Sequence, residues 1–325
     1  MSRRLPACAA AAVAVLCCLI ATHPAAADTE PRRATVGIFV TALNSLSFVT
    51  NTVIADFWVW TITDADRRSP LETAFVVNEA AKTAEQIGTE KLGGRRWDQQ
   101  RIRATLNTRL DVSRFPFDHQ LIQIMIEESF DTVKDMVYVA DREQSGLDPS
   151  VNLTGWEIVG WNIDAAVHKY PTSFGNLEHP EASQSPRILF TVELKRHGVR
   201  LFIDMSLGAF IAFFMMVLTF RMNPTLPPVF AGRMGVTVAT VFTTLISMRV
   251  NASVLAAPFG STLVDRIHVF TLAAGLLTGI AAVAARYYAE TGREAQALAL
   301  DRRVLPIFMV FYFAVVIALI SGAIR

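Results

Sequence analysis

Residues 114–120, with the sequence Arg-Phe-Pro-Phe-Asp-His-Gln, form the stretch around which the rest of the chain is organised. A proline after an aromatic residue and an aspartate two positions later are ordinary turn residues. From residue 121 to residue 126 the side chains then alternate between two faces, which is typical of a β-strand. The stretch is therefore predicted to be a turn that leads into a strand, with a β-rich region before it and four apolar segments well after it.

The composition indicates a membrane protein. Hydrophobic residues make up 52% of the 325 positions, which is more than an ordinary soluble protein carries. The length suggests two domains. The formal net charge of +1 gives no reason to expect a nucleic-acid partner.

Residues 1–27 are predicted to be a signal peptide. Arg3 and Arg4 form a basic start, residues 9–20 form an apolar run, and three alanines precede Asp28. The alternative is a short anchor helix, but the apolar run is too short for a good membrane span. All three cysteines lie inside this segment, at positions 8, 17 and 18. The mature chain is therefore expected to contain no disulfide, although it enters an oxidising compartment.

Residues 28–200 are predicted to form a β-sandwich. Runs rich in β-branched and aromatic residues are separated by turn residues, and many of them alternate at a period of two. The runs are 36–40, 53–62, 101–110, 121–126, 156–167 and 188–194. The segment 70–96 is less regular, and its part 72–87 is compatible with a helix that two glycines at 93 and 94 would end.

Residues 201–325 are predicted to form four transmembrane helices. Each apolar segment reaches about 20 residues with its flanks, enough to cross the hydrocarbon core. The segments are 201–220, 234–248, 267–285 and 304–320. The second is the least hydrophobic and is rich in threonine, so it is expected to face protein or water rather than lipid.

The charges between the apolar segments predict the topology. Arg221 and Arg233 lie between the first two segments without an acidic residue. Four arginines, at 286, 293, 302 and 303, lie between the last two segments, together with three acidic residues. Because basic loops stay in the cytoplasm, the β-domain and the C-terminus are both expected outside.

Taken together, these features resemble the pentameric ligand-gated ion channels over roughly residues 35–325. The Phe-Pro-Phe-Asp turn at 115–118 is similar to the signature loop of that family, and the missing cysteines resemble its bacterial members. Arg196, Arg233, Pro258 and Asp265 fall where the family carries comparable residues. The first apolar segment departs from the family, because it has Gly208 near the position of the usual proline.

The resemblance implies a homopentamer in a lipid bilayer, here the bacterial inner membrane with the β-domain in the periplasm. A small-molecule agonist would bind between the β-sandwich domains and open a pore for inorganic ions. No cofactor, metal or enzymatic activity is implied. The residues expected to couple the two domains are Phe115, Pro116, Phe117, Asp118, Arg196 and Pro258.

Two faces of the second membrane segment compete for the pore. The resemblance assigns the pore lining to one face, made of Gly235, Ala239, Phe242, Ile246 and Arg249. Amphipathicity instead favours the other face, made of Thr237, Thr240, Thr244, Ser247 and Asn251. We expect the first, because polar groups between packed membrane helices are common. The position before Arg233 is glycine and not the glutamate of cation-selective members, which slightly favours anion or weak selectivity.

The expected ligand-binding residues are aromatic, because an aromatic box suits a cationic amine. They are Trp58, Trp60, Phe130, Tyr170 and Phe174. The alternative for the tryptophans is a place in the sandwich core. A further group of carboxylates allows either a divalent-cation site or a solvated acidic edge. It consists of Glu127, Glu128, Asp131 and Asp135.

A function from a different class also fits part of the sequence. A non-conducting, membrane-anchored periplasmic sensor or adhesion protein would explain the signal peptide and the β-domain. It would not explain a threonine-rich segment that runs between Arg233 and Arg249. No phosphate-binding loop or metalloprotease motif points to an enzyme.

Overall fold

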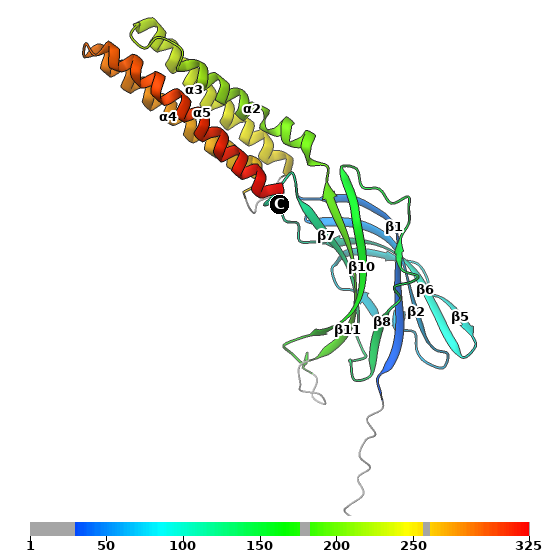
Figure 1. The fold of residues 1–325 in the computed structure, drawn as a ribbon. Helices are drawn as coiled ribbons and strands as arrows, with labels where there is room; N and C mark the ends of the chain where they lie inside the picture. Colours follow the sequence, from blue (N-terminus) through cyan, green and yellow to red (C-terminus); the bar gives the residue numbers. More distant parts are fainter. Residues whose placement is uncertain (1–29, 176–182, 256–260, 325) are drawn as a thin grey trace, which may run out of the picture.

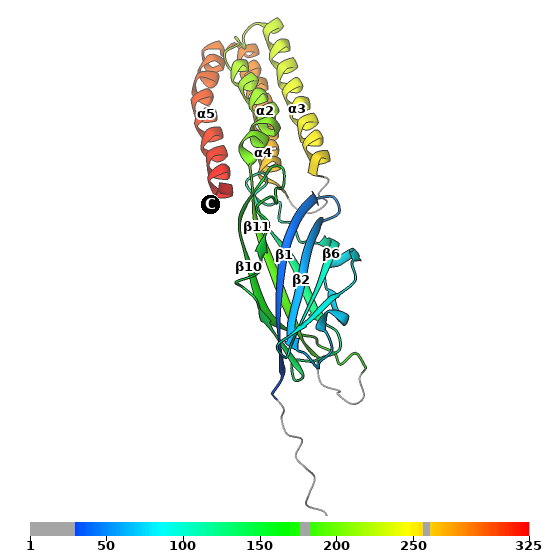
Figure 2. The same cartoon turned by 90° about the vertical axis from the view of Figure 1, so that its right-hand side faces the viewer.

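The computed structural model describes residues 30–175, 183–255 and 261–324. The expected signal peptide and Pro258 lie outside these residues. In Figures 1 and 2 a β-domain and a bundle of four long helices are arranged end to end. The fold class expected from the sequence is confirmed: two β-sheets are followed by four long apolar helices.

The β-domain consists of two facing sheets. The first has the strand order β4-β6-β2-β1-β8, with β5 paired to β6 and β9 paired to β1. The second has the order β10-β11-β7-β3. The strands of the first sheet are β1 (Arg32–Ser47), β2 (Thr52–Asp64), β4 (Glu79–Ala84), β5 (Gly88–Leu92), β6 (Arg95–Asn107), β8 (Met136–Ala140) and β9 (Gly146–Leu147). Those of the second are β3 (Ala74–Val76), β7 (His119–Glu128), β10 (Trp156–Lys169) and β11 (Gln184–Arg196).

Alternation along the strands places the core between the two sheets. In β2 every second residue from Val53 to Val59 is buried, and in β7 the same holds for the isoleucines at 122, 124 and 126. These side chains meet buried residues of β11 such as Phe190. Five of the six predicted runs lie entirely within strands, and the sixth, 101–110, lies in β6 as far as residue 107.

The helix considered for residues 72–87 is wrong. Only a short 3-10 turn, Pro70–Glu72, is present, and β3 and β4 follow it. β4 is largely exposed, but it pairs with β6, and β5 continues this pairing. The hydrogen bonds of a neighbouring strand thus outweigh a weak local preference for helix.

Four helices are long and apolar enough to cross a membrane, so the chain is a membrane protein with four candidate spans. They are α2 (Gly198–Thr219), α3 (Pro227–Leu255), α4 (Leu263–Glu290) and α5 (Glu294–Ile324). The charged loop expected before the last span is wrong in extent: Arg286 lies on α4, Arg302 and Arg303 lie on α5, and only residues 291–293, which include Arg293, separate the two helices. Both views place the end of α5 at the β-domain end of the bundle.

Candidate functional site

A glutamine closes the turn that connects β6 to β7. The buried side-chain amide of Gln120 donates to the carbonyl oxygen of Asp111 at 2.7 Å and to Oδ2 of Asp118 at 2.6 Å. Its oxygen accepts from the backbone nitrogen of Asp111 at 3.0 Å. Hydrogen bonds from Ser113 lower the pKa of the Asp111 carboxyl. This one side chain therefore ties both ends of the turn together without a covalent link, a role that the sequence did not reveal.

Asp118 and Arg196 meet beneath the helices, as the resemblance implied. Asp118 is 1% exposed, and its carboxylate accepts two hydrogen bonds from the guanidinium group of Arg196, at 2.7 and 3.1 Å. The guanidinium carbon lies 4.1 Å from the ring centre of Trp156 and 4.8 Å from those of Phe48 and Phe115. The charge is thus paired on one side and surrounded by aromatic faces on the others, an arrangement that favours arginine over lysine.

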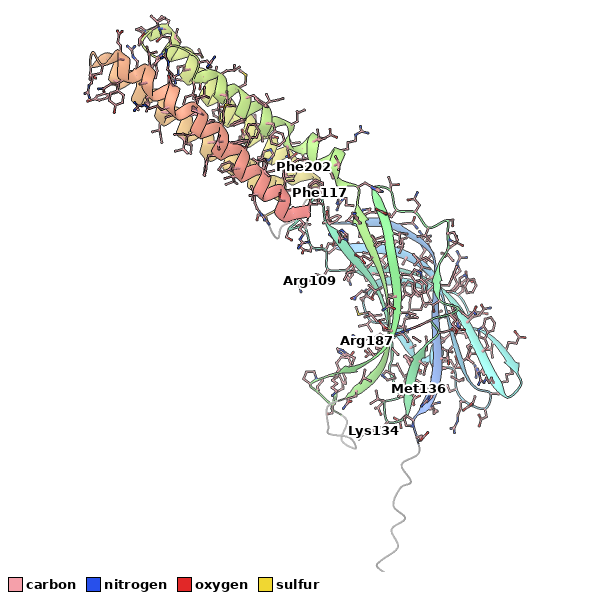
Figure 3. The ribbon with its side chains drawn as sticks, viewed as in Figure 1. Arg109, Phe117, Lys134, Met136, Arg187 and Phe202 are labelled. Atoms are coloured by element: carbon pink, nitrogen blue, oxygen red, sulfur yellow. The ribbon has the colours of Figure 1, made fainter. Side chains whose placement is uncertain are left out.

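The two phenylalanines of the turn pack against the membrane helices. Phe115 is buried in one cluster with Met205 of α2 and Val264 of α4. The ring centre of Phe117 lies 5.5 Å from that of Phe202 on α2, and Figure 3 shows the pair at the junction. Side chains from the β-domain therefore enter the end of the bundle, and the two domains share apolar contacts.

The backbone of the turn also touches the first residue of α2. A Cβ atom added to Gly198 would lie 1.9 Å from the carbonyl oxygen of Pro116 and 3.2 Å from the ring of Phe117. Only a glycine allows this approach without a backbone shift. Of the predicted coupling residues, the structure brings together Phe115, Pro116, Phe117, Asp118 and Arg196. Pro258 lies outside the described residues.

The start of α4 contacts the same turn. Nη2 of Arg266 donates to the carbonyl oxygen of Ser113 at 3.1 Å. Asp265, which the sequence singled out only by its position, forms a capping box with Thr262: each side chain bonds the backbone nitrogen of the other residue at 3.0 Å. Such a box satisfies the free N–H groups of a helix start. It therefore fixes the helix end that carries Arg266.

The threonine face of α3 points into its own subunit. Thr237, Thr240 and Thr244 are buried, and their hydroxyls donate to carbonyl oxygens one turn earlier in the same helix at 2.8–2.9 Å. These groups need no water, because the backbone already accepts their hydrogen bonds.

The same face binds the neighbouring helices near the β-domain end. The Oγ of Ser247 lies 3.0 Å from Nε2 of His268 on α4, and Asn251 donates to the carbonyl oxygen of Met205 on α2 at 2.9 Å. α2 approaches closely here, because a Cβ on Gly208 would lie 2.8 Å from the Oγ of Ser247. Gly208 thus allows close packing of α2 on α3.

The other face of α3 is open in the single chain. Gly235, Ala239, Phe242, Ile246 and Arg249 are all exposed, and the exposed fractions of Phe242 and Ile246 are 61% and 63%. Residues spaced by three and four positions share one side of a helix. A continuous apolar face therefore extends along α3 from Gly235 to Ile246, and Arg249 lies at its end.

Arg233 does not belong to that open face. α3 begins at Pro227, and the completely buried Arg233 side chain points inward to Asp301 on α5. The guanidinium group donates to both carboxylate oxygens, at 2.8 and 3.0 Å. Charge counting placed Arg233 in one loop and Asp301 in another, and this is wrong, because Arg233 lies on α3 and Asp301 lies on α5. The pair fastens the outermost helix to the start of α3.

The tryptophans considered for the ligand site lie outside the sandwich core. Because Phe57 and Val59 face inward, Trp58 and Trp60 point from the outer surface of the first sheet. Nε1 of Trp60 donates to Oδ2 of Asp141 at 3.0 Å. The alternative that they fill the core is therefore wrong.

Two further aromatic candidates meet at the far end of the second sheet. The ring centre of Tyr170 lies 5.0 Å from that of Phe174 and 4.4 Å from that of His168. The Tyr170 hydroxyl donates to Glu127 at 2.6 Å, and Arg187 donates to the same carboxylate at 2.7 Å. Burial and the Glu127 carboxylate raise the pKa of Tyr170, so its hydroxyl stays a donor at neutral pH.

Phe130 lies apart from this group. Its ring is 75% exposed, and the guanidinium carbon of Arg68 lies 5.5 Å from the ring centre. Both residues line a polar cavity of about 670 Å³ at the end of the β-domain, together with Asp66 and Asp135. Within one chain, therefore, the five aromatic candidates form three separate groups.

The carboxylates of β7 and the following loop differ in burial: Glu127 and Glu128 are buried, whereas Asp131 is half-buried and Asp135 is exposed, so only the two aspartates form a solvated acidic edge. Glu127 is bonded as described, and the buried Glu128 accepts from the Tyr138 hydroxyl at 3.4 Å. Burial and the Glu128 charge raise the pKa of Tyr138 well above its ordinary value. Asp131 pairs with an arginine of β1, and Asp135 accepts from Thr132. Within the described residues no group of three or more metal-ligating side chains is present.

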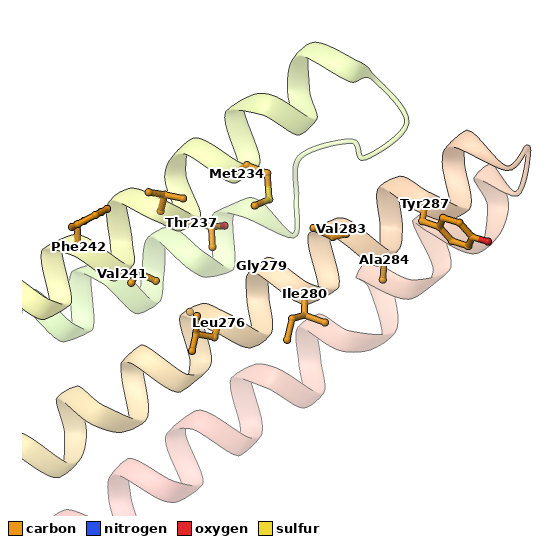
Figure 4. Close-up of a pocket in the computed structure, with 12 residues that line it drawn as sticks. Met234, Thr237, Val241, Phe242, Leu276, Gly279, Ile280, Val283, Ala284 and Tyr287 are labelled. Carbon is orange, nitrogen blue, oxygen red and sulfur yellow. The ribbon is translucent and has the colours of Figure 1, made fainter.

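An apolar groove of about 820 Å³ separates α3 from α4 (Figure 4). Val241 and Phe242 line it from α3, and Leu276, Gly279 and Ile280 line it from α4. At Gly279 the two helices approach each other, because a Cβ there would lie 3.5 Å from the methyl group of Thr237. Comparison of the sequence with protein-family models and with curated proteins finds no match, so the function is inferred from this geometry and from the sequence resemblance.

Proposed function

We propose that the chain is a subunit of a pentameric ligand-gated ion channel. The observation that carries this proposal is the division of α3 into two faces. Its hydroxyl groups are satisfied inside the subunit, and the side from Gly235 to Arg249 is left without a partner in the described chain. In a ring of five copies this side faces the axis, where Phe242 and Ile246 form apolar rings that exclude water when closed.

The junction supports gating from the β-domain. Asp118 and Arg196 fix the turn on β11, while Phe117 lies against α2. A displacement of the turn cannot leave the helices unchanged, because their side chains and backbone are in contact. In the proposal, ligand binding moves this turn and the helices follow.

The agonist site is proposed to lie between two copies of the β-domain. Trp58 and Trp60 are on the outer surface of one sheet, whereas Tyr170 and Phe174 are at the end of the other. Within one chain the two groups are apart. In a ring, the tryptophans of one copy would face the Tyr170 group of the adjacent copy. A small molecule with a positively charged amine suits such aromatic surroundings. The β-domain then faces the periplasm, and the bundle lies in the inner membrane.

The first experiment counts subunits and measures ion flux. Native mass spectrometry of the detergent-purified protein is expected to give five times the mass of the mature chain. In liposomes the protein is expected to conduct inorganic ions under some ligand condition. A stable monomer or dimer, with no flux, would instead support the non-conducting sensor or adhesion protein.

Truncation of the proposed gate is expected to open the channel. Phe242→Ala or Phe242→Ser removes five phenyl rings from the axis, so water and ions remain in the pore without agonist. Ile246→Ser should leak less. If Phe242 instead packs against a neighbouring helix, its truncation leaves a cavity that costs about 3–5 kcal/mol of stability and causes no leak. Basal flux and thermal stability of the same samples separate the two results.

Cysteine scanning gives an independent test of the face. A charged, membrane-impermeant thiol reagent is expected to modify cysteines placed at 239, 242 and 246. Modification at 240, 244 and 247 only would reverse the assignment of the two faces.

Removal of one partner from the junction pair is expected to uncouple the domains. Asp118→Asn and Arg196→Gln each leave a buried polar or charged group without its partner. We expect both variants to assemble as pentamers and to respond poorly to agonist. Size-exclusion chromatography measures assembly, and flux measures the response. If neither variant assembles, the pair is a structural element only.

A further inference from the structure

A continuous series of hydrogen bonds runs from the end of β11 into the turn between β6 and β7. It begins at the guanidinium group of Arg196, which donates to both carboxylate oxygens of Asp118. Oδ2 of Asp118 also accepts a hydrogen bond from the side-chain amide of Gln120 at 2.6 Å. The same amide nitrogen donates to the carbonyl oxygen of Asp111 at 2.7 Å. Gln120 therefore connects the charged pair at one end of the turn with the backbone at the other end.

The series continues from Asp111 to the start of α4. Oδ1 of Asp111 accepts from the backbone nitrogen of Ser113 at 2.8 Å, and the carbonyl oxygen of Ser113 accepts from Nη2 of Arg266 at 3.1 Å. The hydrogen bonds from Ser113 lower the pKa of the Asp111 carboxyl, so this group stays an ionised acceptor at neutral pH. We call the whole series the hydrogen-bond relay, which consists of Arg196, Asp118, Gln120, Asp111, Ser113 and Arg266.

Burial makes the centre of the relay directional. Asp118 is 1% exposed and Gln120 is 2% exposed, so water cannot replace either partner. A buried polar group that loses its partner costs free energy, and the amide must therefore follow the carboxylate when the carboxylate moves. The contact of Phe117 with α2 differs in this respect, because the hydrophobic effect has no direction and allows the rings to slide.

The bond to Asp118 exceeds what is needed to close the turn. Closure requires only the two bonds between the Gln120 side chain and the backbone of Asp111, at 2.7 and 3.0 Å. The additional bond holds the Asp118 carboxylate in the plane in which it receives Arg196. A side chain that served closure alone would not need to bind the charged pair.

We propose that Gln120 is a positioning residue that orients the Asp118 carboxylate and transmits a displacement of the charged pair to Arg266. The start of α4 then receives the movement of β11 through hydrogen bonds, by a route separate from the apolar contact of Phe117 with α2. The inference rests on the proposed function, in which ligand binding moves this turn. Only residues 256–262 separate α4 from α3, so the displaced helix start is close in the chain to the end of the proposed pore helix.

Hydrogen exchange of the purified protein in detergent tests the relay and requires no agonist. Arg196→Gln releases the Asp118 carboxylate, so we expect a several-fold loss of protection at the backbone amides of Asp111 and Ser113 and in the first turn of α4. In a Gln120→Met background the same substitution should add little, because the relay is already interrupted. Gln123→Met, on the opposite face of β7, is the matched control and should leave the effect of Arg196→Gln intact.

The exposed end of the relay provides a variant that does not endanger folding. Arg266 is exposed, so Arg266→Gln should leave the protein folded. We expect it to abolish the response of the α4 start to Arg196→Gln while the amide of Asp111 still responds. A response of α4 that persists in Arg266→Gln would place the connection elsewhere and overturn the proposal.

Gln120→Glu separates positioning from packing, because the side chain keeps its size. At about pH 8 the introduced carboxylate cannot donate to Asp118, so protection at the α4 start should match that of Gln120→Met. Burial and the charges of Asp118 and Asp111 raise the pKa of the introduced carboxyl, and the facing cation of Arg196 opposes them. Towards about pH 5 the carboxyl gains a proton and can donate again. Protection factors at the α4 start should then recover several-fold in Gln120→Glu, whereas those of Gln120→Met should not change.

The outcomes separate the relay from the channel. Equal effects of Arg196→Gln in the unmodified protein and in Gln120→Met, or no recovery of Gln120→Glu with acid, would show that Gln120 only closes the turn. If exchange follows the relay but liposomes show no flux, the relay stands and the channel function fails. If the protein conducts while exchange at the α4 start is independent of Gln120, the channel stands and the relay is wrong.

Discussion

Gly198→Ala is expected to be among the most damaging single substitutions in the chain, although it adds only one methyl group. The new Cβ would lie 1.9 Å from the carbonyl oxygen of Pro116, so the turn or the start of α2 must move. Over-packing usually costs about 1–3 kcal/mol, and a backbone obstacle places this change at the upper end. We expect a clear fall in thermal stability in detergent and a loss of agonist response in whatever fraction assembles.

The matched control is Gly160→Ala in β10. A Cβ at this position meets no atom within 4 Å, and the residue belongs to the β-domain, which also contributes Pro116. The control should unfold within a few degrees of the unmodified protein. An alanine at 198 that leaves both stability and response unchanged would show that the close contact with Pro116 is not required.

Asp301→Asn is expected to cause the second large loss. The substitution leaves the completely buried guanidinium group of Arg233 without its anion, and Nε of that group has no hydrogen-bond partner among the described residues. Breaking a buried pair on one side costs about 3–5 kcal/mol. We therefore expect a lower unfolding temperature and release of α5 from the bundle, which limited proteolysis detects.

Two variants separate burial from charge. Glu290→Gln removes the exposed partner of a pair at 2.8 Å with Arg286 and should cost about 1 kcal/mol or less. The double change Arg233→Met with Asp301→Leu removes both buried charges and should recover most of the stability, because apolar groups of similar size often replace buried pairs well. An Asp301→Asn variant as stable as Glu290→Gln would contradict the role assigned to the pair.

Local patterns predicted much of the fold. A strand that buries one face must alternate, so the runs around Phe57 and Ile124 were visible in the sequence. The four apolar segments were equally clear, because hydrocarbon requires their length and composition. β4 could not be recognised, because it is exposed and owes its conformation to β6, a partner that the local sequence does not name.

The candidate site was predictable only where a resemblance supplied the partner. Asp118 and Arg196 are 78 positions apart, and their meeting came from the family layout rather than from any periodicity. Arg233 and Asp301, 68 positions apart, had no such guide, and charge counting assigned both to loops. Gln120 was also missed, because a glutamine that closes a turn looks like any polar residue at the start of a strand.

The passage from β11 to α2 determines how the molecule can deform. The strand ends at Arg196 and the helix begins at Gly198, so one residue separates the two domains. A longer flexible segment would act as a spring that absorbs small movements. This connection can stretch or bend very little, and Gly198 also contacts Pro116 at the start of the helix. A small tilt of β11 is therefore expected to rotate α2 by a similar amount.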